Sequence, residues 1–475
     1  MVNSIQVCKS IVFFIMNNKE IARKKIVKYV FLIYWMLIFE GAFRKWFFPE
    51  YHQIIFFLRD PVVLLVYLIA WRNNIFTRDG LLTAGVIISL AFIPLIFLQV
   101  VIIKMNVLTL IYGWRVYFYY LPLAFVIKDA FRPEDIHKFI RQTLYVAIPL
   151  SILVYIQFIS PRTSFINAGY NEGMAFVVTG NIVRTTGTFT FTAGQTFFAS
   201  SLMAMLAFVW LYRKQYPLMS MFWLIIATGA SMTHLLLSGS RTAFFMTGLI
   251  VAATFFGLLF TNNVKMKFTG SALMVFLLLI GTVMFLGPFR ESFDALGTRF
   301  EQAEQSEGSA IRRALAPLMI FTNYLTTTPI LGHGIGFGTG GGSQLATGKA
   351  SLVLAEDEWS RIVMEAGPGF GLMFIMYRIV FTLSLVRQTI KSARLDNNLL
   401  PMMFLGFIGF YLFAGQITHI GTLMGYNWIF VGLIMAAAKK QSETVQPIST
   451  PLYPSILGSG HHPEVRAIAS NASLE

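Results

Sequence analysis

Charged residues are scarce in this sequence: Asp, Glu, Lys and Arg together make up 12% of its 475 residues. A soluble domain carries roughly 25%, so this chain has too little charge to cover the surface of a water-soluble globule of its size. The single cysteine, Cys8, excludes a disulfide scaffold. The 46 Phe, 18 Tyr and 8 Trp residues exclude a disordered chain.

Apolar residues are abundant, at 56% of the chain. A membrane-spanning helix needs about 20 mostly apolar residues, and the sequence offers many such runs. We therefore expect an all-α polytopic membrane protein with about twelve spanning helices. The predicted spans are 29–47, 54–71, 81–103, 108–127, 139–159, 194–212, 217–237, 242–260, 268–287, 366–386, 401–419 and 421–438.

The net charge of +15 suggests nucleic-acid binding at first sight, but its distribution fits membrane topology better. If the N-terminus lies in the cytosol, the inside segments before the tail hold 21 Lys and Arg residues and the short outside loops hold 7. Cytosolic loops are enriched in Lys and Arg, so we expect both termini inside and no nucleic-acid partner. No internal repeat supports an inverted-repeat transporter.

These spans divide the chain into five parts. Residues 1–28 read as a basic cytosolic leader, and 29–287 hold nine spans with a smaller outer loop at 160–193. A large outer loop, 288–365, precedes the tenth span and includes a predicted amphipathic helix at 309–325. Residues 366–438 hold the last three spans, and the Ser- and Pro-containing tail 439–475 reads as disordered. In the second span, Asp60-Pro61 suggests an N-cap, so that helix would begin near residue 60.

Charges within or beside apolar segments are costly and point to function or to ion pairing. Glu40 and Arg44 are four residues apart, a spacing that allows a structural ion pair. Arg115 lies among aromatic residues, where it could snorkel to the membrane interface. Arg241 follows a Ser-Gly-Ser turn at a helix N-terminus, which suits anion binding, although a plain loop arginine is the alternative. Arg184 and the threonines beside it could line a polar site or form a solvated turn.

The large outer loop contains two further patterns. A run from Gly332 to Gly341 contains six glycines and surrounds His333, so its backbone could approach a ligand closely, but no Lys-Ser/Thr follows to make a P-loop. Glu358, Arg361 and Glu365 then fall on one helical face, where they could form a base beside an anion clamp or a capping cluster.

Metal and covalent chemistry find little support in the sequence. The seven histidines are scattered, and only His461-His462 in the tail are adjacent. No Gly-x-Ser-x-Gly elbow lies near a usable histidine. We expect no metal and no cofactor.

The order of these motifs resembles the O-antigen ligase and O-antigen polymerase superfamily. The motifs are Ser-Gly-Ser-Arg-Thr-Ala at 238–243, Pro-Ile-Leu-Gly-His-Gly-Ile-Gly at 329–336, and an acidic run that leads into Glu-Ala-Gly-Pro at 365–368. They cover about residues 180–380, and the helix count and the place of the large loop extend the resemblance to the rest of the chain.

The resemblance implies a GT-C-like, metal-independent glycosyltransferase in the bacterial inner membrane, with its active face in the periplasm. Its donor would be a glycan on undecaprenyl pyrophosphate, embedded among membrane lipids, and its partners would include a flippase and a chain-length regulator. Arg241, Arg312 or Arg313, and Arg184 would hold the pyrophosphate. Arg361, the arginine of the possible anion clamp, is a further candidate binding residue.

One departure from the family favours a polymerase over a ligase. Ligases carry His-Asn eleven residues before the Gly of Glu-x-Gly, whereas this sequence has Glu356-Asp357 there. The predicted catalytic bases are therefore Glu356, then His333, then Glu358, which also pairs naturally with Arg361. A transporter or flippase of lipid-linked sugars and a non-catalytic scaffold are the alternatives.

Overall fold

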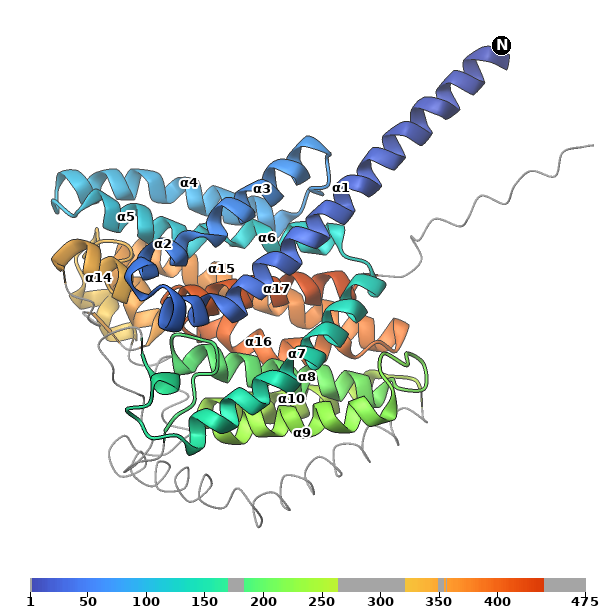
Figure 1. Ribbon diagram of the computed structural model, residues 1–475. Helices are drawn as coiled ribbons and strands as arrows, with labels where there is room; N and C mark the ends of the chain where they lie inside the picture. The colour runs from blue at the N-terminus through green and yellow to red at the C-terminus, as the bar shows by residue number, and fades with distance from the viewer. Residues whose placement is uncertain (1, 170–182, 264–320, 349–353, 356, 440–475) are drawn as a thin grey trace, which may run out of the picture. The chain divides into compact units, whose positions relative to one another are not determined.

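The computed structural model describes residues 2–169, 183–263, 321–348, 354–355 and 357–439. These residues form helices, and no β-strand occurs among them (Figure 1). The helices are α1 (Val2–Ala42), η1 (Phe43–Phe47), η2 (Pro49–Tyr51), α2 (His52–Phe57), α3 (Arg59–Arg72), α4 (Gly80–Val101), α5 (Val107–Trp114), η3 (Arg115–Tyr119), α6 (Leu121–Ala130), α7 (Pro133–Ile159), η4 (Phe165–Asn167), α8 (Thr192–Leu211), α9 (Met221–Leu237), α10 (Arg241–Phe260), α14 (Gly340–Thr347), α15 (Glu358–Asp396), α16 (Leu400–Ala414) and α17 (Gly421–Ala437).

The described residues contain eight helical segments long and apolar enough to cross a membrane, together with three shorter apolar helices, α9, α16 and α17. The protein is therefore an α-helical, membrane-embedded protein. Eleven of the twelve predicted spans correspond to these helices, and the ninth, 268–287, lies outside the described residues. The count of twelve stays a prediction, as do the amphipathic helix at 309–325, most of which lies outside the described residues, and the tail after residue 439.

The structure extends the first predicted span, and it agrees with the predicted start of the second helix but not with its cap. The first helix begins at Val2 and its candidate span runs from Asn17 to Phe47, so both start before the predicted span 29–47, and the cytosolic leader stays a prediction. Helix α3 begins at Arg59, close to the predicted start near residue 60, and the candidate span that contains it starts at Ile54, as the predicted span 54–71 does. Asp60 does not cap a helix there, because its carboxylate binds Arg115.

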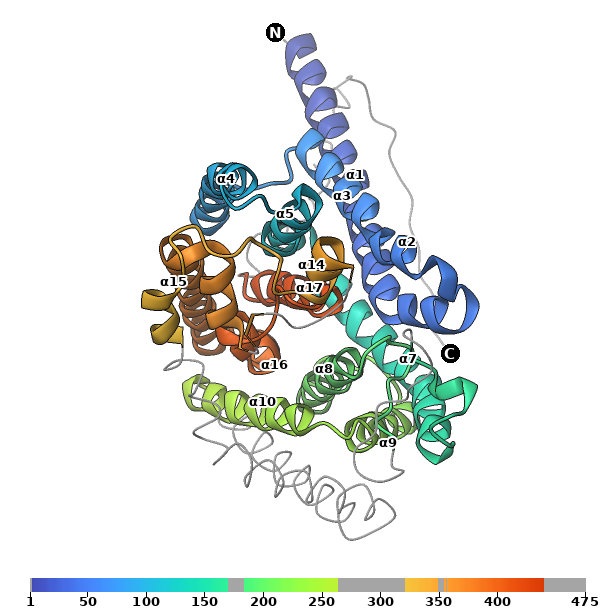
Figure 2. The same ribbon diagram turned by 90° about the vertical axis from the view of Figure 1, so that its left-hand side faces the viewer.

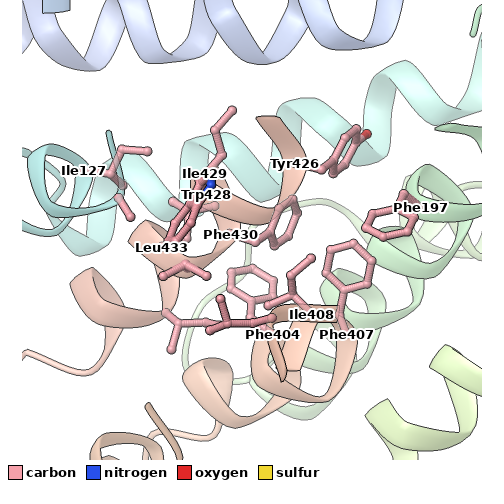
Figure 3. Close-up of a cluster of buried hydrophobic side chains, with 14 of the residues drawn as sticks. Ile127, Phe197, Phe404, Phe407, Ile408, Tyr426, Trp428, Ile429, Phe430 and Leu433 are labelled. Atoms are coloured by element: carbon pink, nitrogen blue, oxygen red, sulfur yellow. The ribbon is translucent and has the colours of Figure 1, made fainter. Parts of the chain in front are cut away.

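The core lies where α6, α8, α16 and α17 meet. Figure 2 shows α17 in the middle of the described helices, and the close-up in Figure 3 shows its side chains packed against α6, α8 and α16. Phe430 of α17 contacts both Phe404 and Phe407 of α16, with ring centroids 5.2 and 4.8 Å apart. Gly432 lets α17 approach the backbone of α6, since a Cβ there would lie 2.9 Å from the Ala124 carbonyl oxygen. Aromatic packing and a small residue thus hold the central helices together.

The outer helices expose apolar side chains. On α4 the exposed residues include Ile87, Leu90 and Phe97, and on α3 they include Leu68 and Trp71. A soluble protein rarely exposes such continuous apolar faces. Lipid contact accounts for them, in agreement with a membrane-embedded fold.

The segments between helices gather at two ends of the helices, which lie at the left and the right in Figure 1. At the right-hand end, Lys128 pairs with Asp79, Arg23 with Asp135, and Tyr212 donates to the Asn397 carbonyl. Most of the exposed Lys and Arg side chains of the described residues lie at this end, which corresponds to the predicted inside segments. The sidedness of the membrane stays a prediction.

Candidate functional site: two buried ionic clusters

The left-hand end contains a helix that turns back on itself. Helix α15 is broken at Gly367, whose φ of 78° and ψ of 164° are not helical, and Pro368 follows. A Cβ on Gly371 would lie 2.8 Å from the Val363 Cα, so the short segment before the break folds back along the main part of the helix. A helix rises about 1.5 Å per residue, so the segment 358–366 carries Glu358 back alongside the next turns of α15.

Four charged residues of α15 form what we call the acid–arginine centre: Glu358, Arg361, Glu365 and Arg378. Each is at most 1% exposed. Arg361 donates to Glu365 at 2.8 Å and to Glu358 at 2.5 Å, so the predicted alignment of these three residues on one helical face is confirmed. Arg378 reaches Glu358 at 3.2 Å across the fold-back. The charges of the two carboxylates and the two guanidiniums cancel, which limits the free-energy cost of burying them.

Arg378 also closes the end of a neighbouring helix. Its guanidinium donates to the carbonyl oxygens of Leu412, Tyr411 and Gly415 at 2.8–2.9 Å, where α16 ends. The last carbonyls of a helix lack intrahelical partners and carry partial negative charge. Arg378 therefore fixes the end of α16 and the acid–arginine centre relative to each other.

The glycine-rich segment 332–338 packs on this centre through its backbone. The Glu365 carboxylate accepts hydrogen bonds from the amides of Gly336 and Gly338 at 3.0 and 2.9 Å, and from the Tyr117 hydroxyl at 2.7 Å. A Cβ on Gly332 would lie 2.4 Å from the Glu365 carbonyl oxygen. These glycines permit close approach of the loop to helix α15, whereas the sequence suggests approach to a ligand.

A second group, which we call the arginine cluster, joins α1, α3 and two π-helical turns. It consists of Glu40, Arg44, Arg59, Asp60 and Arg115. The predicted Glu40–Arg44 pair is present at 3.2 Å, and the second Glu40 oxygen lies 2.6 Å from Arg59 Nε. Arg115 binds Asp60 in bidentate fashion, at 2.5 and 2.9 Å, so it does not snorkel. Arg44 and Arg115 lie in the π-helical turns η1 and η3, and such turns are frequent at functional sites.

The link between α16 and α17 connects the two clusters. Thr418 donates to Glu358 from both its amide, at 3.0 Å, and its hydroxyl, at 2.9 Å. Three residues later, the Gly421 carbonyl accepts a hydrogen bond from Arg59 at 3.4 Å. His419 lies between them, and its Nδ1 is buried with no partner among the described residues. Burial, with the positive charge of Arg361 nearby, lowers the pKa of His419 to about 4, so its imidazole is neutral at neutral pH.

The smaller outer loop and the α9–α10 link lie next to the end of α1. Lys45 donates to the Thr186 hydroxyl and the Gly187 carbonyl, each at 2.9 Å. Thr185 donates to the Leu237 carbonyl at 2.7 Å, which ties this loop to the end of α9. The structure therefore brings the neighbourhood of Arg184 close to the turn that precedes Arg241.

The local geometry at Arg241 agrees with the expected tight turn. Gly239 has a φ of +55°, and the Ser238 hydroxyl accepts from the Ser240 amide at 3.3 Å. Arg241 is the first residue of α10 and is half-buried. The backbone amides at a helix N-terminus favour an anion, and Arg241 stands at that end of α10.

The other predicted site residues divide into two groups. Glu356, Arg312 and Arg313 lie outside the described residues. His333 is half-buried in the glycine-rich segment, and its amide donates to the Met364 carbonyl at 2.7 Å. Glu358 and Arg361 are committed to the hydrogen bonds of the acid–arginine centre. No group of three His, Cys, Asp or Glu residues suited to a metal ion occurs in the described part of the chain.

The sequence does not identify Arg59, Asp60, Arg378 or Tyr117 as site residues. The sequence suggests that Asp60 caps a helix and places Arg378 within the span 366–386. A signal is available for Arg378, because a lone arginine within an apolar run must find a buried partner. The sequence alone does not say that this partner is Glu358.

No protein-family model matches the chain, and a search of curated proteins finds no significant match.

Proposed function

We propose that the protein is a polysaccharide polymerase-type glycosyltransferase of the bacterial inner membrane. It would transfer a glycan from undecaprenyl pyrophosphate to a sugar hydroxyl at the periplasmic face, during assembly of O-antigen or exopolysaccharide. The observation that supports it best is the concentration of buried or half-buried cationic side chains at one end of the membrane helices, around Arg184, Arg241 and the two clusters.

The proposed reaction makes one bond and breaks one. The acceptor hydroxyl oxygen attacks the anomeric carbon of the donor sugar, and the bond from that carbon to the pyrophosphate oxygen breaks. The pyrophosphate leaves with the electron pair, and a base takes the hydroxyl proton. Arg241 and Arg184 would neutralise the charge that develops on the leaving group, since arginine binds phosphate oxygens through paired N–H donors.

The base would come from the residues that lead into helix α15 or from the glycine-rich segment. Glu358 is poorly suited, because Arg361, Arg378 and Thr418 already occupy its oxygens. Glu356 remains the first candidate, and His333 the second. Glu356→Gln should reduce turnover by roughly 10²–10⁴-fold if it acts as the base.

The test uses purified protein and an undecaprenyl-pyrophosphate oligosaccharide, with chain growth or transfer as the readout. Growth of the glycan by wild type and its loss in Glu356→Gln would support the proposal. If Glu356→Gln keeps near-normal turnover while His333→Ala abolishes it, the base is in the glycine-rich segment.

A transporter or flippase of lipid-linked sugars is the second candidate. The acid–arginine centre favours it, because Glu358 and Arg378 are buried among apolar helices, and buried charges mark transport pathways. Movement of the labelled lipid-linked oligosaccharide across proteoliposomes, without any product of transfer, would favour this candidate over the glycosyltransferase.

A further inference from the structure

The arginine cluster gathers several charges in a buried place. Arg59 pairs with Glu40, Arg115 pairs with Asp60, and Arg44 shares Glu40 with Arg59. Arg59 is fully buried and Arg115 is 8% exposed. Taking a guanidinium out of water costs several kcal/mol, so its remaining donors should be matched by acceptors.

Two of these donors have no acceptor. Nη2 of Arg59 and Nη1 of Arg115 are buried and have no hydrogen-bond partner among the described residues. Arginine donors in such a position normally bind a carboxylate or a phosphate. Two unused donors on neighbouring guanidiniums point to an anion with several acceptor oxygens.

An aromatic ring lies where the three guanidiniums converge. The Cζ atoms of Arg44, Arg59 and Arg115 lie 5.3, 5.8 and 5.1 Å from the centroid of the Phe56 ring. Each such cation–π contact stabilises a cation by about 0.5–2 kcal/mol, and a ring accepts no directed hydrogen bond from the two unused donors. An anion that enters the cluster would take the place of this ring.

The surroundings of the cluster are apolar and exposed. The segment that carries Phe56 presents a row of exposed apolar side chains, with Phe47 65% and Ile54 68% exposed. The other members of this row are Phe43, Phe48, Tyr51, Phe57 and Leu58. A ligand that satisfies both features has an anionic head and an apolar tail.

We propose that the arginine cluster binds the headgroup of an anionic membrane phospholipid. The phosphate oxygens accept from Arg59 and Arg115, the Phe56 ring moves aside, and the acyl chains lie along the exposed row. This proposal uses other residues than the anion site proposed around Arg241 and Arg184, and lipid binding at it can be measured without the transfer reaction.

The test measures lipid binding, so its outcome is independent of any glycosyltransferase activity. Purified protein in neutral detergent is titrated with phosphatidic acid, with phosphatidylcholine and with free inorganic pyrophosphate, and bound lipid is counted by native mass spectrometry. We expect phosphatidic acid to bind at least roughly tenfold more tightly than phosphatidylcholine. Binding of free pyrophosphate with no preference for phosphatidic acid would overturn the assignment to a lipid.

Variants then locate the site. Arg115→Gln should weaken phosphatidic acid binding about tenfold, whereas Arg387→Gln, an exposed arginine at the other end of the helices, should leave it unchanged. Because Arg59→Gln alone would remove one arginine from the buried Glu40, the double variant Glu40→Gln/Arg59→Gln removes both charges and keeps the net charge of the cluster. Unaltered binding in folded samples of both the Arg115 variant and the double variant would overturn the proposal.

Discussion

Glu365→Gln is the perturbation for which the structure allows the most detailed expectation. The Glu365 carboxylate accepts from four donors, which are Arg361, Tyr117 and the amides of Gly336 and Gly338. Glutamine has one acceptor oxygen, and its NH₂ group faces donors whichever way the amide is turned. Two of the four donors therefore lose their acceptor in a fully buried place.

The expected magnitude follows from those two contacts. A hydrogen bond to a charged group contributes about 1.5–3 kcal/mol, and breaking a buried ion pair costs about 3–5 kcal/mol. We expect Glu365→Gln to lower the free energy of unfolding by about 3–5 kcal/mol. Because the glycine-rich segment is anchored by this carboxylate, its amides at Gly336 and Gly338 should also exchange with solvent at least roughly tenfold faster.

Two measurements check this expectation: unfolding in mixed micelles and hydrogen exchange resolved to residues 332–339. The matched control is Asp396→Asn, which changes an exposed carboxylate at the other end of the same helix. It should change neither quantity. A Glu365→Gln protein with unfolding free energy within about 1 kcal/mol of wild type and normal protection of both amides would refute the anchoring role.

The remaining predictions concern other parts of the same end. In the transfer assay, Arg241→Lys should reduce activity strongly because it keeps the charge but loses the paired donors; full activity of Arg241→Ala at normal protein level would contradict the clamp role. Gly41→Ala should destabilise the protein by about 1–3 kcal/mol, because its Cβ would lie 2.4 Å from the Thr188 carbonyl oxygen. The control Gly229→Ala places a Cβ with nothing within 4 Å, so it should be neutral or slightly stabilising. Thermal unfolding of both variants checks this difference. Burial lowers the pKa of His419 from 6.5 to about 4, so on acidification the unfolded chain binds a proton at this residue before the folded protein does. The free energy of unfolding should therefore fall by up to about 3 kcal/mol as the pH drops from 6.5 towards 4. His419→Gln should flatten this part of the pH profile of the unfolding midpoint, and identical profiles would exclude the contribution.

The sequence predicts the local features of this protein well. Apolar runs locate the helices, and the spacing of Glu358, Arg361 and Glu365 predicts contacts that the structure contains. These features depend only on helical geometry, in which residues three or four apart are neighbours.

Apolar periodicity and residue spacing do not predict contacts between helices that are distant in the sequence. The pairs Glu40–Arg59 and Asp60–Arg115 depend on how the helices are ordered around α17, which apolar periodicity does not encode. The same limit applies to Gly332: the close neighbour of this glycine is the Glu365 backbone, which the sequence does not place beside it.

The charged residues of both clusters lie where helices are interrupted, and this coincidence has a physical cause. An interrupted helix leaves carbonyls and amides that need new hydrogen-bond partners. Here, the carbonyls at the end of α16 accept from Arg378, the Gly421 carbonyl accepts from Arg59, and the Thr418 amide donates to Glu358. A buried charge needs such partners as much as the broken helix needs the charge. Each would be costly alone, so removing either the arginines or the helix breaks should destabilise this end.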